Sequence, residues 1–413
     1  MKFQLLVLPT TPRVLEDGVK LRPIGRNTEK YIEMLDEVRQ ICILSDELGY
    51  DCFSITEHHF HSEGYEISVA PLLLFADLAA RTKQIKFAPI GLVLTTWDPI
   101  RCAEELAVLD NLTKGRLMGG FARGSHNRWV SVLGQKYGVS GTFGADKAQD
   151  ERNREVFEEM FDVMLKAWTE DALEYDGEYY KVPNPFEEGI GNWLPQQWTK
   201  DRGNLEELNA EGRIRKVSVV PRPYQKPHPP LFTAYSASER TVKWAAGHGV
   251  IPSCLFSDPQ DFLNACRVYQ KISAEHGRTL KLGENMAACR TVTVGKTHEE
   301  AYELALEATG RSYYEYFNQV GAAGFFRYPG EEGPITFKSK KDALDRLMAL
   351  HFAIVGTVDE VKAQLEPLAR CHADGELEWC GLMLDHQGLS PLDTTLEQVE
   401  MFGTQVMPEF QDS

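Results

Sequence analysis

The chain has 413 residues, and 43% of them are hydrophobic, which is ample for a large core. Its 44 Lys and Arg residues against 61 Asp and Glu residues give a formal net charge of -17. That charge disfavours nonspecific binding to nucleic acid or anionic membranes, so a small-molecule substrate is the better expectation.

Neither a targeting segment nor a disulfide framework is expected. The first apolar run is interrupted at Pro9 and Pro12, which is too early for a signal peptide. No apolar run approaches the ~20 residues needed to cross a membrane. The eight cysteines are scattered and form no CxxC pair. These observations indicate a cytoplasmic protein with mostly buried thiols.

Strand-like apolar runs alternate with helix-length amphipathic segments along most of the chain. In chain order, the runs predicted as strands are 3–8, 51–56, 85–94, 116–124, 229–235, 249–256, 286–295 and 377–385. Each is followed by helical sequence, and eight βα units are what a (β/α)8 TIM barrel requires. A doubly wound open sheet is the alternative, but no GxGxxG follows the first strand.

The segment 172–228 interrupts this alternation between the fourth and fifth strands. It begins with DGEYYKVPNPF and continues through a polar stretch rich in Trp, Gln and Asn. Barrels tolerate long insertions of this kind. We therefore expect one barrel domain over 1–413, with 172–228 as an insertion that has its own β-hairpins.

Glu57, His58 and His59 follow the second predicted strand, at the end where barrels carry their active sites. Adjacent strand residues point to opposite faces, so the two histidines cannot easily chelate one ion, and a metal site is disfavoured. We expect Glu57 and His59 to be packed and hydrogen-bonded between barrel and helices. His58 is then expected to point into the barrel mouth, where an imidazole can transfer protons.

Two turns on neighbouring predicted strands are suited to binding an anion. GGFARGSHNRW (119–129) has small residues followed by Arg123 and Arg128, and a guanidinium is a good phosphate ligand. A rim arginine paired with a carboxylate is the alternative. AYSASERTVKWAA (234–246) is a strand end, a hydroxyl-rich turn and a helix start, and a helix N-terminus attracts anions. Ordinary N-capping explains one of its serines equally well.

Several of these pieces together resemble the bacterial luciferase-like flavin monooxygenases. The matching stretches are TEHHF, residues 81–124, 151–168 and 229–249, and the terminal QVMPEF. They occur in the same order over nearly the whole chain. The resemblance implies a TIM barrel with reduced FMN (FMNH2) in its mouth, supplied by a separate NAD(P)H:flavin reductase, and a homodimer. It also implies that O2 is activated as a flavin C4a-(hydro)peroxide, which oxidises an organic substrate.

The resemblance also implies roles for individual residues. The phosphate-holding arginine of the family falls on Arg123, and its phosphate-binding hydroxyls fall on Ser238 and Thr241. The active-site histidine, the first of the EHH motif, falls on His58. A non-proline cis peptide at the end of the third strand would lie at Ile90–Gly91, next to the cofactor.

Three positions or stretches depart from the luciferase pattern, and the last of them bears on the substrate. Ala122 stands where luciferases carry a reactive cysteine, and Ala237 stands where the family has a carboxylate. The stretch 185–220 is longer than in luciferases, so light emission from a fatty aldehyde is disfavoured.

The leading expectation is a two-component, FMNH2-dependent monooxygenase that acts on a small cyclic or aromatic compound. One alternative is a deazaflavin (F420)-dependent hydride-transfer enzyme. Another is a noncatalytic flavin-binding subunit, against which the retention of Arg123 and His58 argues. The Gly-rich segment 318–340, after the seventh strand, resembles the mobile lid of luciferases.

Overall fold

The computed structural model describes residues 1–256, 258–372, 375–384 and 388–411. The chain divides into two compact units. The first, here called the barrel unit, comprises Met1–Leu92, Met118–Ala122 and Leu231–Ser413. The second, here called the helical unit, comprises Val93–Leu117 and Arg123–Pro230, so the whole segment 172–228 belongs to it.

A nearly closed barrel of parallel strands forms the centre of the barrel unit. The strand order is β3-β2-β1-β12-β10-β9-β8-β5-β4, neighbouring strands run parallel, and β3 and β5 also lie in contact. The strands are β1 (Lys2–Val7), β2 (Cys52–Ile55), β3 (Lys86–Pro89), β4 (Leu92–Val93), β5 (Gly119–Ala122), β8 (Leu231–Ser236), β9 (Ile251–Cys254), β10 (Ala287–Val294) and β12 (Trp379–Met383). Each of the eight predicted runs overlaps at least one of these strands, and the run 85–94 holds both β3 and β4, so the predicted fold class is confirmed.

Strand β11 (Ala353–Gly356) is not predicted from the sequence. It pairs in parallel with Thr291–Val294 of β10, and of these residues Thr291 also pairs with β12. The run is only four residues long and lies between two helices, so its apolar pattern is hard to separate from theirs.

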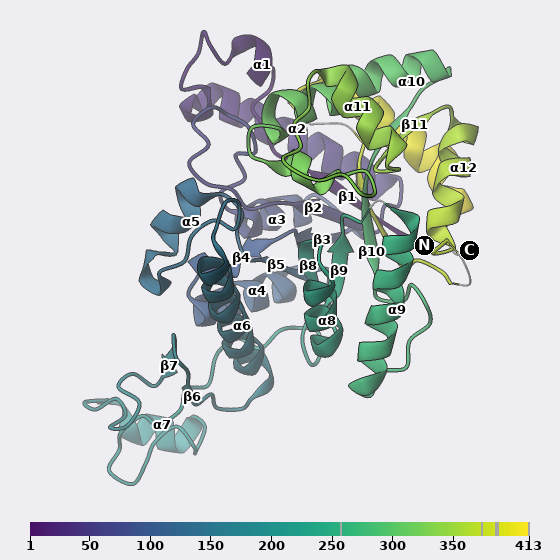
Figure 1. The fold of residues 1–413 in the computed structure, drawn as a ribbon. Coiled ribbons are helices and arrows are strands. Elements are labelled where there is room, and N and C mark those ends of the chain that lie inside the picture. Colours follow the sequence, from purple (N-terminus) through teal and green to yellow (C-terminus); the bar gives the residue numbers. More distant parts are fainter. Residues whose placement is uncertain (257, 373–374, 385–387, 412–413) are drawn as a thin grey trace. The chain divides into compact units, whose positions relative to one another are not determined.

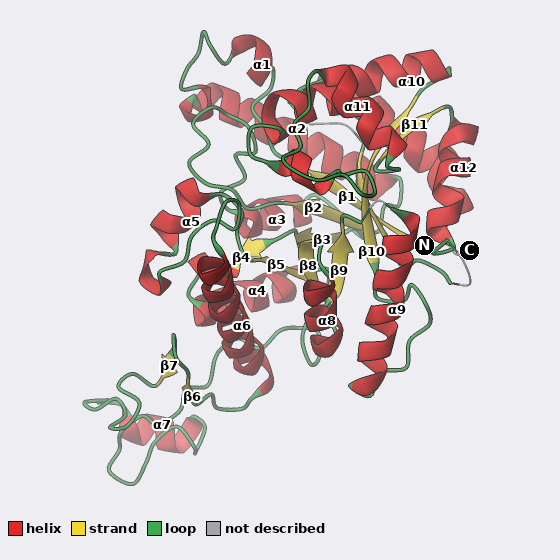
Figure 2. Cartoon of the chain, viewed as in Figure 1, coloured by secondary structure: helices red, strands yellow, loops and turns green. Residues whose placement is uncertain are grey.

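The strands are buried because one face of the sheet lines the barrel and the other is covered by helices. All eight residues of β10 and all five of β12 are buried. One buried cluster combines small side chains with a few large ones: Cys52, Ala88, Ile90, Met118, Phe232, Ile251, Ala287 and Trp379. In Figure 2, α8 and α9 lie beside each other, and α8 contacts β8 and β9.

Most long helices of the barrel unit begin at a Ser, Thr, Asn or Asp whose side chain accepts a backbone N–H. The helices and helical turns are α1 (Val14–Asp17), η1 (Ile24–Arg26), α2 (Thr28–Glu47), α3 (Pro71–Ala79), α8 (Glu239–His248), α9 (Pro259–Glu275), α10 (His298–Ala305), η4 (Leu306–Gly310), η5 (Tyr313–Phe317), η6 (Ala322–Phe325), α11 (Lys340–Ala349), α12 (Val358–Ala369), α13 (Leu392–Met401), η7 (Phe402–Val406) and η8 (Met407–Glu409). The two chain ends meet, since the Met1 amino group donates to Phe410 O at 2.6 Å (Figure 1).

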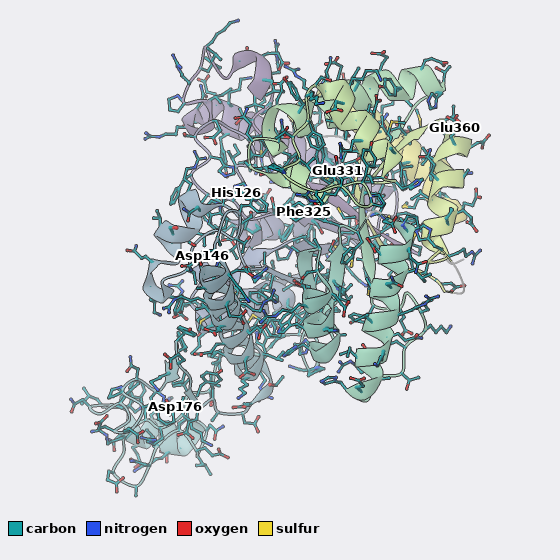
Figure 3. The ribbon with its side chains drawn as sticks, in the orientation of Figure 1. His126, Asp146, Asp176, Phe325, Glu331 and Glu360 are labelled. Carbon is teal, nitrogen blue, oxygen red and sulfur yellow. The ribbon has the colours of Figure 1, made fainter. Side chains whose placement is uncertain are left out.

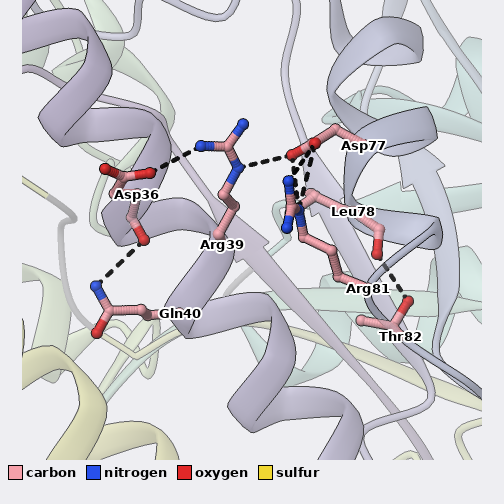
Figure 4. Close-up of polar contacts among 7 residues, drawn as sticks. All are labelled: Asp36, Arg39, Gln40, Asp77, Leu78, Arg81 and Thr82. Carbon is pink, nitrogen blue, oxygen red and sulfur yellow. Dashed lines mark hydrogen bonds and ion pairs between the residues drawn. The ribbon is translucent and has the colours of Figure 1, made fainter.

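Charged side chains join α2 to α3 on the surface of the barrel unit (Figure 4). Arg39 donates to Asp77 of α3 at 2.7 Å and to Asp36 of its own helix at 2.7 Å. Asp77 also accepts from Arg81 at 2.9 Å, and hydrogen bonds from Arg81 and Arg39 hold the pKa of Asp77 below its ordinary value. This arrangement ties together the two helices that flank β2 in the chain.

The helical unit contains the segments that connect β4 to β5 and β5 to β8. Its elements are η2 (Leu94–Thr96), α4 (Pro99–Thr113), α5 (Asn127–Leu133), η3 (Gln135–Tyr137), α6 (Lys147–Thr169), β6 (Tyr175–Asp176), β7 (Lys181–Val182) and α7 (Gln196–Arg202). The buried Trp168 indole donates to Ala103 O at 2.9 Å and joins α6 to α4. Strands β6 and β7 form an antiparallel hairpin, which Tyr180 links to Asp98 at 2.8 Å.

The eight cysteines are all buried and carry free thiols, as the sequence predicts. Within the described ranges, no helix combines the length and the apolar character needed to cross a membrane.

Candidate active site

Glu57 and His59 form a pair directly after β2. Glu57 is only 3% exposed, and the Nε2 atom of His59 donates to its carboxylate at 3.1 Å. A buried carboxylate needs such a partner, because desolvation otherwise penalises its charge. The pair therefore fixes the backbone on both sides of His58.

His58 is held through its main chain and through one ring nitrogen. Its N–H donates to Ser68 O at 3.2 Å, and its Nδ1 atom lies 3.1 Å from the Thr56 hydroxyl. The same Nδ1 atom is 3.6 Å from a carboxylate oxygen of Glu66. Because Nδ1 contacts these groups, Nε2 is the ring nitrogen to which we assign proton transfer.

Sequence reasoning did not identify the buried groups that surround His58. The ring of His61 stacks on that of His58 at 5.4 Å, with 17° between their planes. Glu66 is 3% exposed and accepts a hydrogen bond from the Tyr316 hydroxyl at 3.1 Å. His61 and Glu66 lie within ten residues of the EHH motif and could have been proposed. Tyr316 could not, since it is 250 residues away in the chain.

Tyr316 reaches this cluster from a helix that contains two π-helical turns. Residues 298–317 form one continuous helix, in which η4 and η5 are the π turns. Such turns are frequent at functional sites, because the extra residue shifts which side chains face a neighbour. The ring of Tyr316 stacks on Tyr65 at 3.9 Å, and the Tyr65 hydroxyl is hydrogen-bonded to the buried Ser312.

Two titratable groups of the cluster, His61 and Tyr316, are favoured in their neutral forms. Burial, followed by the neighbouring His58, lowers the pKa of His61. Burial, followed by the charge of Glu66, raises the pKa of Tyr316. His61 is therefore favoured as a neutral ring and Tyr316 as a neutral hydroxyl donor.

The Ile90–Gly91 peptide is cis, as the resemblance implied. Gly91 lies against β5, where a Cβ atom would be 2.6 Å from the carbonyl carbon of Phe121 and 3.0 Å from Ala122 N. Both positions are in the barrel unit, and only glycine allows this approach.

Ser238 and Thr241 lie at the N-terminus of the ten-residue helix α8. Ser238 is the N-cap, and its hydroxyl accepts from Thr241 N at 3.3 Å. The two side-chain oxygens are 3.0 Å apart, and Ser238 is exposed. The capping role considered from the sequence is thus present, and it leaves a pair of hydroxyls at a helix end that attracts anions.

Arg123, in the helical unit, is paired with a carboxylate. Its Nη1 atom donates to Asp150 of α6 at 2.6 Å, and its carbonyl accepts from Thr95 at 3.0 Å. The next residue, Gly124, has φ +90° and would place a Cβ atom 2.7 Å from Val93 and Val130. Glycine is therefore required directly after the arginine. Arg128, the second arginine that the sequence suggested as an anion ligand, is exposed on α5.

The segment 318–340 is fixed at two buried aromatic residues. Phe326 and Phe337 are 2% and 3% exposed and belong to one hydrophobic cluster. Asn318 exchanges hydrogen bonds with the backbone of Phe337, at 3.0 and 2.9 Å. Glu331 lies between these anchors and is paired with Arg346 of α11 at 2.6 Å. Figure 3 shows Phe325 and Glu331 on this part of the chain, which precedes α11.

The chain matches the luciferase-like monooxygenase family over residues 18–190 and 192–374. It is 26% identical over 253 residues to an alkanal monooxygenase alpha chain of Photobacterium leiognathi, covering 61% of this chain and 58% of that one. It is 25% identical over 295 residues to 3,6-diketocamphane 1,6-monooxygenase of Pseudomonas putida, covering 71% and 72%. A trigonelline monooxygenase oxygenase component of Acinetobacter baylyi is 25% identical over 259 residues, covering 61% and 59%. The matches thus span less than two thirds of the alkanal and trigonelline relatives.

Solved structures share the fold over nearly the whole chain. The oxygenating constituent of 3,6-diketocamphane monooxygenase from Pseudomonas putida, in complex with FMN, has a TM-score of 0.72 at 20% identity, covering 99% of this chain and 98% of that one. A coenzyme F420-dependent tetrahydromethanopterin reductase from Methanopyrus kandleri has a TM-score of 0.59 at 16% identity, with 99% of each chain covered. Because the family match spans most of its length, the chain belongs to the luciferase-like monooxygenase family.

Proposed function

We propose that the protein is the oxygenase of a two-component system that uses FMNH2 and O2 to oxygenate a small organic, cyclic or aromatic substrate. The observation that carries the proposal is the placement of His58. Its ring follows a barrel strand at the catalytic end and is held through Nδ1 among buried polar groups. An imidazole fixed in this way is suited to giving and receiving a proton at Nε2.

The chemistry of the available donors fits FMN. A guanidinium at Arg123 and paired hydroxyls at Ser238 and Thr241 are the groups that phosphate monoesters prefer. Their assignment to the FMN phosphate rests on the family resemblance. We assign the close backbone at Ile90 and Gly91 to contact with the flavin ring. When bound in reduced form, FMN supplies the two electrons with which O2 is activated.

The protein residues then have four tasks. The family resemblance assigns phosphate binding to Arg123 and, separately, to Ser238 and Thr241, and we assign to His58 the holding or moving of a proton at Nε2. Glu57 and His59 hold His58 in place. The segment 318–340 acts as a lid that excludes water while the reaction proceeds.

Two partners follow from the proposal. FMNH2 is produced by a separate NAD(P)H:flavin reductase, and support comes from the relative named as an oxygenase component. A homodimer is the expected assembly from the family resemblance.

Hydride transfer with deazaflavin (F420) is the second candidate, motivated by the shared fold of an F420-dependent reductase. Equilibrium binding separates the two candidates without knowledge of the substrate. Titration of the protein with FMNH2 and with reduced F420, both without oxygen, should give tighter binding of FMNH2. Preference for F420 by tenfold or more would favour hydride transfer.

A further inference from the structure

Glu66 stands out among the buried groups that the proposed function does not yet use. Its side chain is 4% exposed, so its carboxylate is almost completely removed from water. Its backbone N–H donates to the Thr10 hydroxyl at 3.1 Å, and Thr10 donates in turn to Leu8 O at 2.8 Å. The loop that carries the carboxylate is therefore anchored to the end of β1. A carboxylate held this firmly inside the protein requires a compensating group.

Two imidazole rings, those of His58 and His61, lie near Glu66, and of these two His58 is the one suited to carry a positive charge. The Nδ1 atom of His61 lies 2.8 Å from Tyr65 O, and a carbonyl only accepts, so Nδ1 carries the proton there. Burial and the adjacent His58 lower the pKa of His61, which favours its neutral form. His58 has its Nδ1 atom 3.6 Å from the Glu66 carboxylate, close enough for strong attraction once the ring is protonated.

Tyr316 fixes the other side of the carboxylate. Its hydroxyl donates to the Glu66 oxygen at 3.1 Å, and this is the same oxygen that faces His58. Burial and the negative charge of Glu66 raise the pKa of Tyr316, so it stays a neutral donor. Tyr316 is thus able to hold the carboxylate in place but not to replace His58 as its cation.

We propose that Glu66 is a positioning residue for His58. Its carboxylate, oriented by Tyr316, stabilises the proton on Nδ1 of His58, so that Nε2 is the nitrogen that exchanges protons with the reacting groups. The proton that moves leaves Nε2 and returns to it, and the Nδ1 proton stays in the protein. The role in turnover rests on the proposed function, whereas the coupling between Glu66 and His58 does not.

The coupling is tested first without any flavin. The histidine rings are labelled with ¹³C and ¹⁵N, the His58 signal is identified by its loss in His58→Asn, and its titration is followed by NMR. Among the described residues, Glu66 and His61 lie next to this ring, Tyr316 contacts both of them, and the exposed Glu63 lies on the same loop. Glu66→Gln keeps the shape but removes the charge, and should lower the midpoint of the His58 titration by about 1–2 pH units.

Glu63→Gln is the matched control, because it removes one carboxylate charge from the same loop at an exposed position. It should move the His58 midpoint by less than about 0.3 units. Glu66→Asp restores the charge at a greater distance and should give a midpoint between wild type and Glu66→Gln. If Glu66→Gln does not fold, Glu66→Asp decides the matter. A His58 midpoint that Glu66 variants leave unchanged, or that Glu63→Gln shifts equally, would overturn the proposal.

The role in turnover is tested with FMNH2 and O2. Glu66→Gln should lower kcat about tenfold or more at neutral pH with little change in KM, and Glu66→Asp should recover part of the loss. A Glu66→Gln enzyme with wild-type kcat would overturn the positioning role. If the wild-type protein has no oxygen-dependent activity at all, the proposed function fails, and the titration alone still decides whether Glu66 controls His58.

Discussion

At the scale of single residues, His58 is the group on which the proposed chemistry depends most. His58→Asn removes the proton carrier but leaves a side chain of similar size beside Thr56 and Glu66. We expect the fold and flavin affinity to persist while turnover falls by ~10²-fold or more, the usual loss when a proton-transfer group is removed. Product formation at the wild-type rate in the folded variant would reassign His58 to a structural role.

Arg123 is expected to distinguish FMN from riboflavin. Removing a charge-assisted phosphate contact costs roughly 1.5–3 kcal/mol, which is about ten- to a hundredfold in affinity. Arg123→Ala should therefore weaken FMN far more than riboflavin in a fluorescence titration. Equal losses for both ligands would show that the phosphate is held elsewhere.

If Arg123 binds the FMN phosphate as proposed, the Asp150 carboxylate competes with that phosphate for its guanidinium. It accepts from the guanidinium at 2.6 Å, so FMN has to displace or share a carboxylate whose charge repels phosphate. Asp150→Asn should tighten FMN by about two- to fivefold, the size of an exposed ion pair, and leave riboflavin unaffected. Weaker FMN binding in this variant would instead mean that Asp150 orients the guanidinium for its ligand.

At the scale of elements, the segment 318–340 combines firm anchors with an exposed middle. Phe326 and Phe337 are buried, whereas most residues between them are exposed, and Glu331 there pairs with Arg346. Protease should therefore cut first between the anchors, and flavin with substrate should protect this part. Arg346→Gln should accelerate that cleavage about two- to fivefold, because it removes one partly exposed pair. Uniform resistance of the segment in the free protein would count against a lid.

Regular elements were predictable where the apolar pattern was long and clearly bounded. The eight runs that become barrel strands meet this condition, and β11, with four residues between helices, does not. The position of His58 after β2 was also predictable, because it depends only on which residue follows a strand end. Glu66 was nearby but is a common residue type without a motif. Tyr316 depends on π turns and on a contact 250 residues away, which no local pattern reveals.

At the scale of the whole molecule, the proposed oxygen activation with FMNH2 and the alternative hydride transfer place different demands on the barrel. An oxygenase has to control the reaction of bound FMNH2 with O2, whereas a hydride carrier gains nothing from doing so. The two candidates therefore differ in a property that can be measured without the substrate.

The most direct test is rapid mixing of oxygenated buffer with the protein and substoichiometric FMNH2, with the formation of FMN followed by absorbance. We expect FMN to form more slowly than from free FMNH2 and in more than one phase, with the slow phase shortened in His58→Asn. Formation of FMN in one phase at the rate of free FMNH2, by protein that binds reduced F420 tightly, would contradict the account.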